Sequence, residues 1–369
     1  VAETILYILL ALVVLLVMIT IHEAGHYTAG KILGFKINEF AIGMGPKLFS
    51  RKKKNGEVFS VRLFPLGGYC AFEGEDENMP DSPDAFNSQK PWKRIIVLVS
   101  GALFNFISAI LIVFIAFWAF GDDALAIQKV YESSVNYDAY QQGTGFKEGD
   151  IIYKIDGKVV YLVVDVSNYI AGAGDEMDVV VLRENAQGKR EKVTIENVRK
   201  GKFTVDKLDE NGNVVLDENG NPVKEEANGW GVQNAYVKNS FTFGQALGRS
   251  VPYCLRAGGY ILETLGGLIT GRVPIKDIGG PITTIDMTTQ VIRTGFSNVL
   301  FLITLISVNL AVFNLLPLPA LDGSRVIFVL IEWIFRKPVN RKVEGWIHAI
   351  GMILLFGLVI LVDVLRYLT

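Results

Sequence analysis

The sequence predicts a membrane α-helical bundle of four transmembrane helices, with a small β element after the first helix and an α+β domain between the second and the third. Half of the 369 residues are apolar although 20% are charged. The apolar residues gather in four stretches, 4–21, 95–120, 299–316 and 346–368. Each stretch approaches or exceeds the roughly 18 to 20 residues that a helix needs to cross a bilayer. The first stretch lacks the basic start and the small-residue cleavage site of a signal peptide, so we expect it to be retained.

Positive charges cluster in two of the connecting loops. Eleven Lys and Arg residues lie between the first two stretches and five between the last two. Because short cytoplasmic loops are enriched in Lys and Arg, we expect both loops in the cytoplasm and both chain ends outside. The segment 121–298 is then extracytoplasmic, and Cys70 and Cys254 lie on opposite sides and form no disulfide. No basic stripe indicates nucleic acid, so the bilayer is the expected environment.

Turn residues and alternating apolar residues divide the rest of the chain. Residues 35–75 read as short strands separated by Gly and Pro, and residues 76–94 as a polar loop. In the outer segment we expect strands within 151–160, 177–183 and 189–195, and a helix at 165–173. The Asn-Gly repeat at 208–223 reads as exposed β-turns rather than as a calcium site.

One apolar segment does not qualify as a further span. Residues 241–272 are interrupted by Pro252, Arg256 and Glu263, so an amphipathic helix on the membrane surface is the interpretation. The predicted division of the chain is therefore 1–121, 122–238, 239–298 and 299–369.

A metal-binding motif follows the first apolar stretch. His22-Glu23-Ala24-Gly25-His26 has the form His-Glu-x-x-His. On a helix the two histidines stand one turn apart, about 6 Å along the axis, on one face. Two imidazoles can then hold one zinc ion, and Glu23 can act as general base toward zinc-bound water. Ionisable residues beside an apolar span are costly, which favours a functional role over chance.

A catalytic zinc site needs a third protein ligand. The only other histidine is His348, which we interpret as a residue at the membrane interface. Asp322 follows the third stretch in Asn314-Leu-Leu-Pro317-Leu-Pro319-Ala-Leu-Asp322-Gly, where the prolines end a helix. Asp322 could instead cap a helix over 324–335. Since a zinc site at the same depth lacks a ligand, we predict that Asp322 completes it.

These two motifs, at the ends of the first and third spans, resemble those of the site-2 proteases, and most closely the bacterial RseP-type regulators of the sigma-E response. Three further segments match that branch: Gly43-Met-Gly45-Pro46 with Pro65-Leu-Gly-Gly-Tyr69, Gly101-x-x-x-Asn105, and Gly279-Gly-Pro-Ile282. Residues 125–200 are similar to a PDZ domain. The chain has room for one such domain where many relatives have two, and Ser324-Arg325 stands where many carry Gly-His.

The resemblance implies an intramembrane zinc metalloprotease of the bacterial inner membrane, with one zinc ion. Its substrates would be single-pass membrane proteins, such as anti-sigma factors already cut by a site-1 protease, or signal-peptide remnants. An unwound substrate would pair by β-addition near Gly43 and Gly45, and Asn314, beside Pro317 and Pro319, would bind its backbone. Asn105 is either an active-site residue or polar glue between helices.

Two other classes of protein fit the sequence less well than a protease does. A transporter would show internal repeats among its spans, which the sequence lacks. An inactive PDZ-bearing scaffold would have lost Glu23 or one of the predicted zinc ligands. The base and the three ligands are all present: His22, Glu23, His26 and Asp322.

Overall fold

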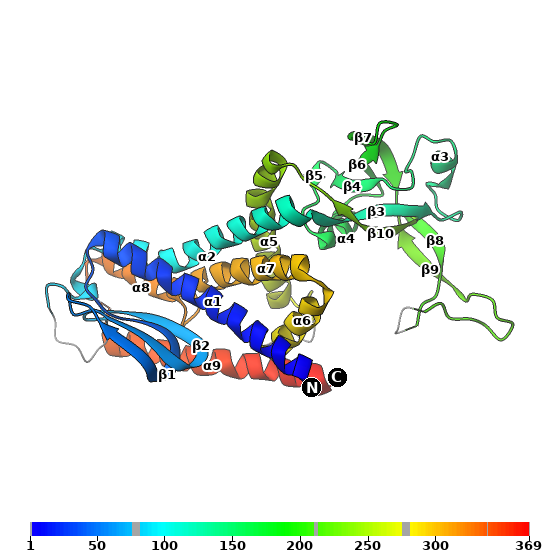
Figure 1. Cartoon of the computed structure of the whole chain (residues 1–369). Coiled ribbons are helices and arrows are strands. Elements are labelled where there is room, and N and C mark those ends of the chain that lie inside the picture. The colour runs from blue at the N-terminus through cyan, green and yellow to red at the C-terminus, as the bar shows by residue number, and fades with distance from the viewer. Residues whose placement is uncertain (1, 76–81, 210–212, 275–280, 338, 369) are drawn as a thin grey trace. The chain divides into compact units, whose positions relative to one another are not determined.

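The computed structural model describes residues 2–368 apart from 76–81, 210–212, 275–280 and 338 (Figure 1). Its contacts divide the chain into two units, residues 1–116 with 246–369, and residues 117–245. The first and last parts of the chain therefore fold together as one unit. Gly279 and Gly280 of the predicted Gly-Pro segment lie outside the described residues.

Four helices in the described part of the chain are long and apolar enough to cross a membrane. They are α1 (Ala2–Leu33), α2 (Pro91–Phe120), α7 (Phe296–Leu315) and α9 (Arg341–Leu368), and they correspond to the four predicted stretches. Helix α1 continues beyond residue 21, so the His-Glu-x-x-His motif lies inside it. The helix ends before Gly34, whose φ of +80° is typical of a glycine that closes a helix.

Two other described helices come directly before α7 in the chain, and one comes directly after it. Helix α5 spans Phe243–Ile269, α6 spans Pro281–Thr294 and α8 spans Asp322–Phe335. The buried residues of α5 include Ala246, Ser250, Tyr253 and Ala257, a spacing that gives the helix one packed face. On that face the ring of Tyr253 lies 6.4 Å from the ring of Phe301 on α7. The location of α5 at a membrane surface stays a prediction.

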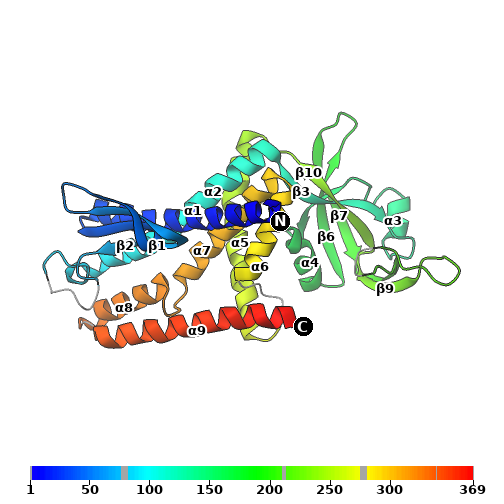
Figure 2. The same cartoon turned by 60° about the horizontal axis from the view of Figure 1, so that its bottom comes forward.

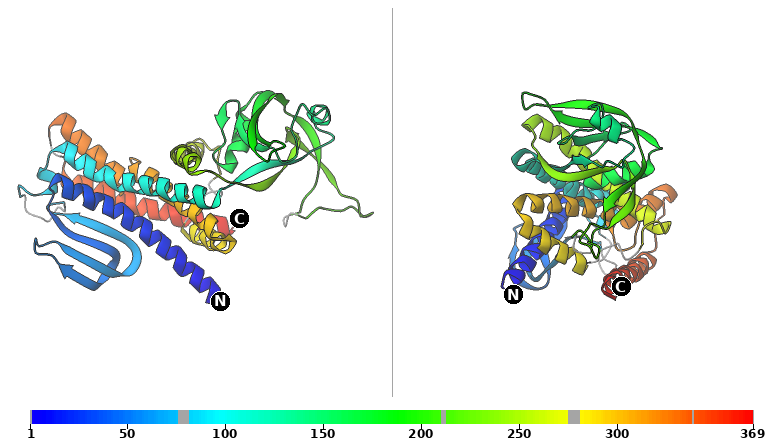
Figure 3. Two further views of the ribbon diagram at one scale, coloured as in Figure 1. Left: turned by 45° about the horizontal axis from the view of Figure 1, so that its top comes forward. Right: turned by 90° about the vertical axis from the view of Figure 1, so that its right-hand side faces the viewer.

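Residues 35–75 form two long bent strands rather than the predicted series of short ones. The strands are β1 (Ile37–Lys52) and β2 (Val58–Phe72), and they run antiparallel. Phe40 is paired with both Cys70 and Phe59, so the first half of β1 lies between the two halves of β2. The β element packs beside α1 (Figure 3). The second half of β2, from Gly68 onward, lies closest to the part of α1 that carries the His-Glu-x-x-His motif.

The second unit contains an antiparallel sheet with strand order β10-β3-β4-β6-β7 and β5 paired to β4 (Figure 2). Its strands and helices are β3 (Asp122–Val130), α3 (Tyr137–Gln141), β4 (Ile151–Ile155), β5 (Lys158–Val159), α4 (Val163–Gly172), β6 (Glu176–Glu184), β7 (Arg190–Arg199), β8 (Gly201–Asp206), β9 (Lys224–Gly229) and β10 (Val232–Asn239). The predicted strands and helix of 151–195 are present with small differences at their ends. Asp156 and Gly157 have φ of 45° and 73° and form the tight turn between β4 and β5.

Candidate metal centre

The two motif histidines face the same side of α1. His22 and His26 are 8% and 7% exposed, and their Nε2 atoms lie 3.1 Å apart. A helix brings residues i and i+4 onto one face, which is why the local sequence suffices to pair these rings. Both imidazoles therefore present a ring nitrogen to one point.

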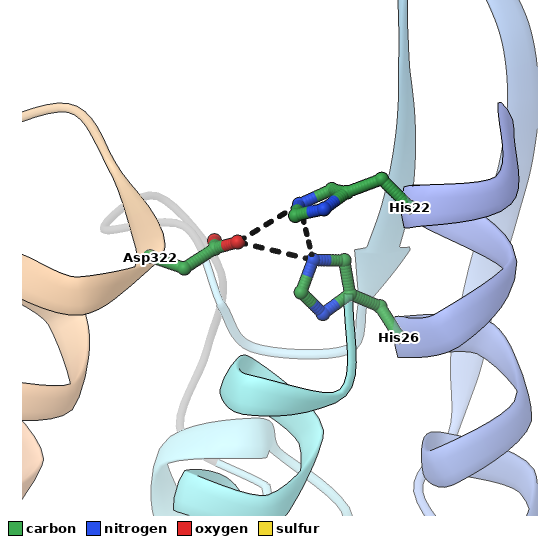
Figure 4. A group of neighbouring side chains, drawn as sticks. All are labelled: His22, His26 and Asp322. Carbon is green, nitrogen blue, oxygen red and sulfur yellow. Dashed lines mark hydrogen bonds and ion pairs between the residues drawn. The ribbon is translucent and has the colours of Figure 1, made fainter. Parts of the chain in front are cut away.

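Asp322 reaches that point from the other end of the chain. Helix α7 ends at Leu315, and the chain turns through Pro317 and Pro319 before α8 begins at Asp322. Oδ2 of Asp322 lies 2.9 Å from Nε2 of His22 and 3.3 Å from Nε2 of His26 (Figure 4). The cap position of α8 is Leu321, and no side chain caps the helix. The carboxylate is thus directed at the histidines rather than at the helix end.

The donor set fits a zinc ion. The three ligand atoms lie within 4.8 Å of one another, and they form the one such cluster found among the described residues. Ligands at about 2.0–2.1 Å from a tetrahedral zinc ion are about 3.3 Å apart. The three separations of 2.9, 3.1 and 3.3 Å are close to that value. Two imidazoles and one carboxylate are also a ligand combination of catalytic zinc sites.

The backbone of α2 orients one of the ligands. Nδ1 of His26 lies 2.8 Å from the main-chain oxygen of Val97, which can only accept a hydrogen bond. Nδ1 therefore carries the proton, and the lone pair is on Nε2, the atom that faces Asp322. No motif in the sequence predicts the contact with Val97.

Glycines allow α1 and α2 to approach this closely. A β-carbon at Gly25 would lie 2.4 Å from the main-chain oxygen of Ser100, and one at Gly101 would lie 2.5 Å from Nε2 of His26. Small residues at helix contacts permit close backbone approach in membranes. The sequence shows one of these glycines in the His-Glu-x-x-His motif and the other in the second apolar stretch, but it does not show that the two helices meet there.

A buried ion pair fixes the helix that carries Asp322. Arg94 on α2 and Glu332 on α8 are 4% and 8% exposed, and Nη1 of Arg94 lies 2.6 Å from Oε2 of Glu332. The pair links α2 to α8, because removal of Glu332 would leave the buried Arg94 charge without its carboxylate partner. Arg341 at the start of α9 lies 3.2 Å from the second oxygen of Glu332.

Glu23 lies between the histidines and the β element. A β-carbon at Gly68 on β2 would be 3.4 Å from Cγ of Glu23, so this strand runs directly beside the carboxyl-bearing side chain. Glu23 also interacts with the backbone N–H of Cys70 on the same strand. Glu23, the general base that the motif predicts, therefore lies beside an extended segment of backbone.

The remaining predicted residues lie at different distances from this centre. Nδ2 of Asn105 lies 3.4 Å from Nδ1 of His22, whereas Nδ2 of Asn314 donates to Leu310 within α7. Gly43 and Gly45 have φ of +82° and +84°, and a β-carbon on either would collide with Phe64. These two glycines therefore have a structural reason to be present, the sharp bend of β1.

Comparison with known proteins agrees with this geometry. The model of "Peptidase family M50" matches residues 10–358. The chain belongs to peptidase family M50. This family of site-2 proteases includes zinc metalloproteases, so the M50 chain is a zinc metalloprotease and its cofactor is Zn²⁺. Its four apolar helices suit a membrane protein.

Several relatives match the M50 chain over nearly its whole length. Two of those that are named putative zinc metalloproteases come from Clostridium perfringens and Fusobacterium nucleatum. The one from Clostridium perfringens is 33% identical over 97% of this chain and 98% of the relative. The one from Fusobacterium nucleatum is 31% identical over 96% and 97%. The zinc metalloprotease RasP of Bacillus licheniformis is 27% identical over 94% of each chain.

Proposed function

We propose that this M50 peptidase cuts peptide bonds within or next to the transmembrane segments of single-pass membrane proteins, as an RseP-type enzyme. The observation that carries the proposal is the location of the donor cluster. His22 and His26 are buried on α1, a helix apolar enough to cross a membrane, and α2, a second such helix, covers them. A peptide bond that reaches this centre has to come from a chain that is itself in contact with the apolar helices.

The proposed roles follow from the contacts. His22, His26 and Asp322 hold one zinc ion, which when bound polarises the scissile carbonyl and makes water more acidic. Glu23 accepts the proton released by the attacking water and gives it to the leaving amine. The neighbouring Cys70 N–H keeps the Glu23 side chain directed along β2.

The substrate binds in an extended form, since a helical peptide bond is shielded by its own helix. We expect β-addition to the β element, along the part of β2 beside Glu23 and toward the bend at Gly43 and Gly45. Asn314 donates to its own helix through Nδ2, which leaves its Oδ1 to accept a substrate N–H. Pro317 and Pro319 border the same path, because they form the turn that leads to Asp322.

Asn105 belongs to the site as an orienting residue for His22. In the described part of the chain its Oδ1 is buried without a hydrogen-bond partner, while its Nδ2 faces Nδ1 of His22. A half-turn of the amide brings Oδ1 to that position, where it accepts the Nδ1–H bond of His22. This arrangement satisfies the buried oxygen and leaves the lone pair of His22 on Nε2.

The biological setting is part of the same proposal. We place the enzyme in the bacterial inner membrane with both termini and the unit of residues 117–245 outside, the latter acting as a single PDZ-type domain. Its partners are anti-sigma-factor-like substrates or signal-peptide remnants, with a site-1 protease making the first cut. The charge distribution in the two short loops supports this orientation.

Purified full-length protein in lipid vesicles provides the test. The wild type should bind zinc and cleave a single-pass substrate in or next to its membrane segment. Asp322→Ala should lose both zinc and cleavage, because two histidines alone do not complete the ligand set. Full zinc content and normal cleavage in that variant would remove Asp322 from the site. A transporter or an inactive scaffold would give no zinc-dependent cleavage by the wild type.

A further inference from the structure

The turn that carries Asp322 has an unusual backbone. Ala320, two residues before the ligand, has φ of +73°, a left-handed conformation that residues other than glycine rarely adopt. Such a conformation persists only when surrounding contacts impose it. Within the turn itself, Leu321 N–H bonds to the Leu318 oxygen at 3.2 Å.

A second contact comes from α9, a helix that supplies no ligand. The backbone N–H of Ala320 donates to Nδ1 of His348 at 2.9 Å. Because Nδ1 accepts this bond, His348 is neutral with its proton on Nε2, and its lone pair is not available to a metal ion. The ring is held in place by Phe328 on α8, whose ring centre lies 5.7 Å away.

The next turn of α9 packs against the same turn of the chain, at Pro319. A β-carbon at Gly351 would lie 2.0 Å from Cβ of Pro319, so only glycine fits at that position. His348 and Gly351 are three residues apart and lie on one face of α9. Together they contact two consecutive residues of the turn, Pro319 and Ala320.

We infer that His348 and Gly351 form a latch on α9 that holds the Pro319–Ala320 turn and thereby sets the position of the Asp322 carboxylate. His348 is a positioning residue that acts through the backbone of Ala320, and it touches neither metal nor substrate. The inference deepens the proposed function and rests on Asp322 being a zinc ligand. It gives the last span a role in assembling the metal centre.

The test measures metal affinity rather than activity. Full-length protein in detergent is titrated with Co²⁺ against a chelator, and the visible absorption of the bound Co²⁺ reports on its ligands. His348→Ala should weaken Co²⁺ binding about tenfold or more, the range seen when residues that orient metal ligands are removed. His348→Asn should restore binding, since its side-chain oxygen can take the place of Nδ1 as the acceptor. Gly351→Ala should also weaken binding, by displacing Pro319.

Two controls separate the possible failures. Ile347→Ala, on the same helix and 38% exposed, should leave Co²⁺ binding unchanged. Asp322→Ala should abolish it, and if it does not, the proposed site itself is wrong. If Asp322→Ala abolishes Co²⁺ binding while His348→Ala leaves it unchanged, or if His348→Asn binds no better than His348→Ala, the latch is refuted and the site stands.

Discussion

Gly101 on α2 faces His26 on α1 so closely that a β-carbon there would lie 2.5 Å from Nε2, the atom that points to Asp322. The same β-carbon would lie 2.7 Å from Cε1 of His22. A single residue on one apolar helix therefore determines whether both imidazoles of the other can meet. The centre depends on the packing of α1 against α2 as much as on the motif.

The first prediction follows from this contact. Gly101→Ala should displace the imidazoles and lower zinc affinity at least tenfold, with a loss of stability of about 1–3 kcal/mol from overpacking. Zinc content after dialysis and the unfolding temperature are the measurements. Gly357→Ala is the matched control, because among the described residues no heavy atom outside the helix's own backbone lies within 4 Å of a β-carbon at that position on α9. Equal zinc content in the two variants would contradict the prediction.

Glu23→Gln should separate metal binding from chemistry. The substitution keeps the three ligands and removes the base, so zinc content should match the wild type while cleavage falls by about 10²–10⁴-fold. The ratio of zinc to protein and the cleavage rate of a single-pass substrate are measured on the same preparation. Near-normal cleavage by this variant would show that another group accepts the proton.

Asn105 gives a prediction about the orientation of His22. Asn105→Leu removes the acceptor for Nδ1–H of His22 and should weaken zinc binding about 10–100-fold. Asn105→Asp retains an acceptor oxygen and should bind zinc far more tightly than the Leu variant. Chelator competition measures both affinities. Two variants with the same affinity would assign Asn105 to helix packing alone.

The β element should lose stability in acid. Burial raises the pKa of Glu57, but hydrogen bonds from Lys31, Lys53 and Asn55 outweigh it and hold that pKa at about 2. A carboxyl group with a lowered pKa stabilises the fold above its unfolded pKa of about 4.3, and this contribution is lost as the pH falls toward 2. We therefore expect the protection of β1 and β2 from hydrogen exchange to decrease between about pH 4.5 and 2.

Glu57→Gln tests this assignment. The variant should be less stable at neutral pH by about 1–3 kcal/mol, because Lys31 and Lys53 lose the charged acceptor that the buried Glu57 carboxylate provides. Its protection should also change less with pH than that of the wild type. Some pH dependence should remain, since Ser60, Arg62 and Lys47 likewise lower the pKa of Glu39 to about 2. Identical pH profiles for the two proteins would exclude Glu57 as a source.

The last prediction concerns orientation in the membrane. In a background with Cys70 and Cys254 replaced by alanine, a cysteine at Glu218 should react with an impermeant maleimide in intact cells. A cysteine at Lys54 should react only after the cells are opened. The reason is the excess of Lys and Arg in the loop that contains Lys54. The opposite labelling pattern would reverse the proposed topology.

Local patterns in the sequence were enough to predict the four apolar helices and the pairing of His22 with His26. The reason is physical: a stretch that crosses a bilayer is recognisable by length and polarity alone, and residues i and i+4 share a helix face in any context.

The tertiary structure alone decided the contacts that complete the centre. Asp322 lies 300 positions from His22. The Val97 contact is made by a main-chain oxygen, which every residue type has, so the residue type does not predict it. Gly25, Gly101 and Gly351 are required only because other parts of the chain approach them closely. Which backbones meet is set by the packing of segments far apart in the chain, and neither hydropathy nor periodicity encodes that packing. The sequence thus determined the chemistry of the ligands, and the fold determined how they are brought together and held.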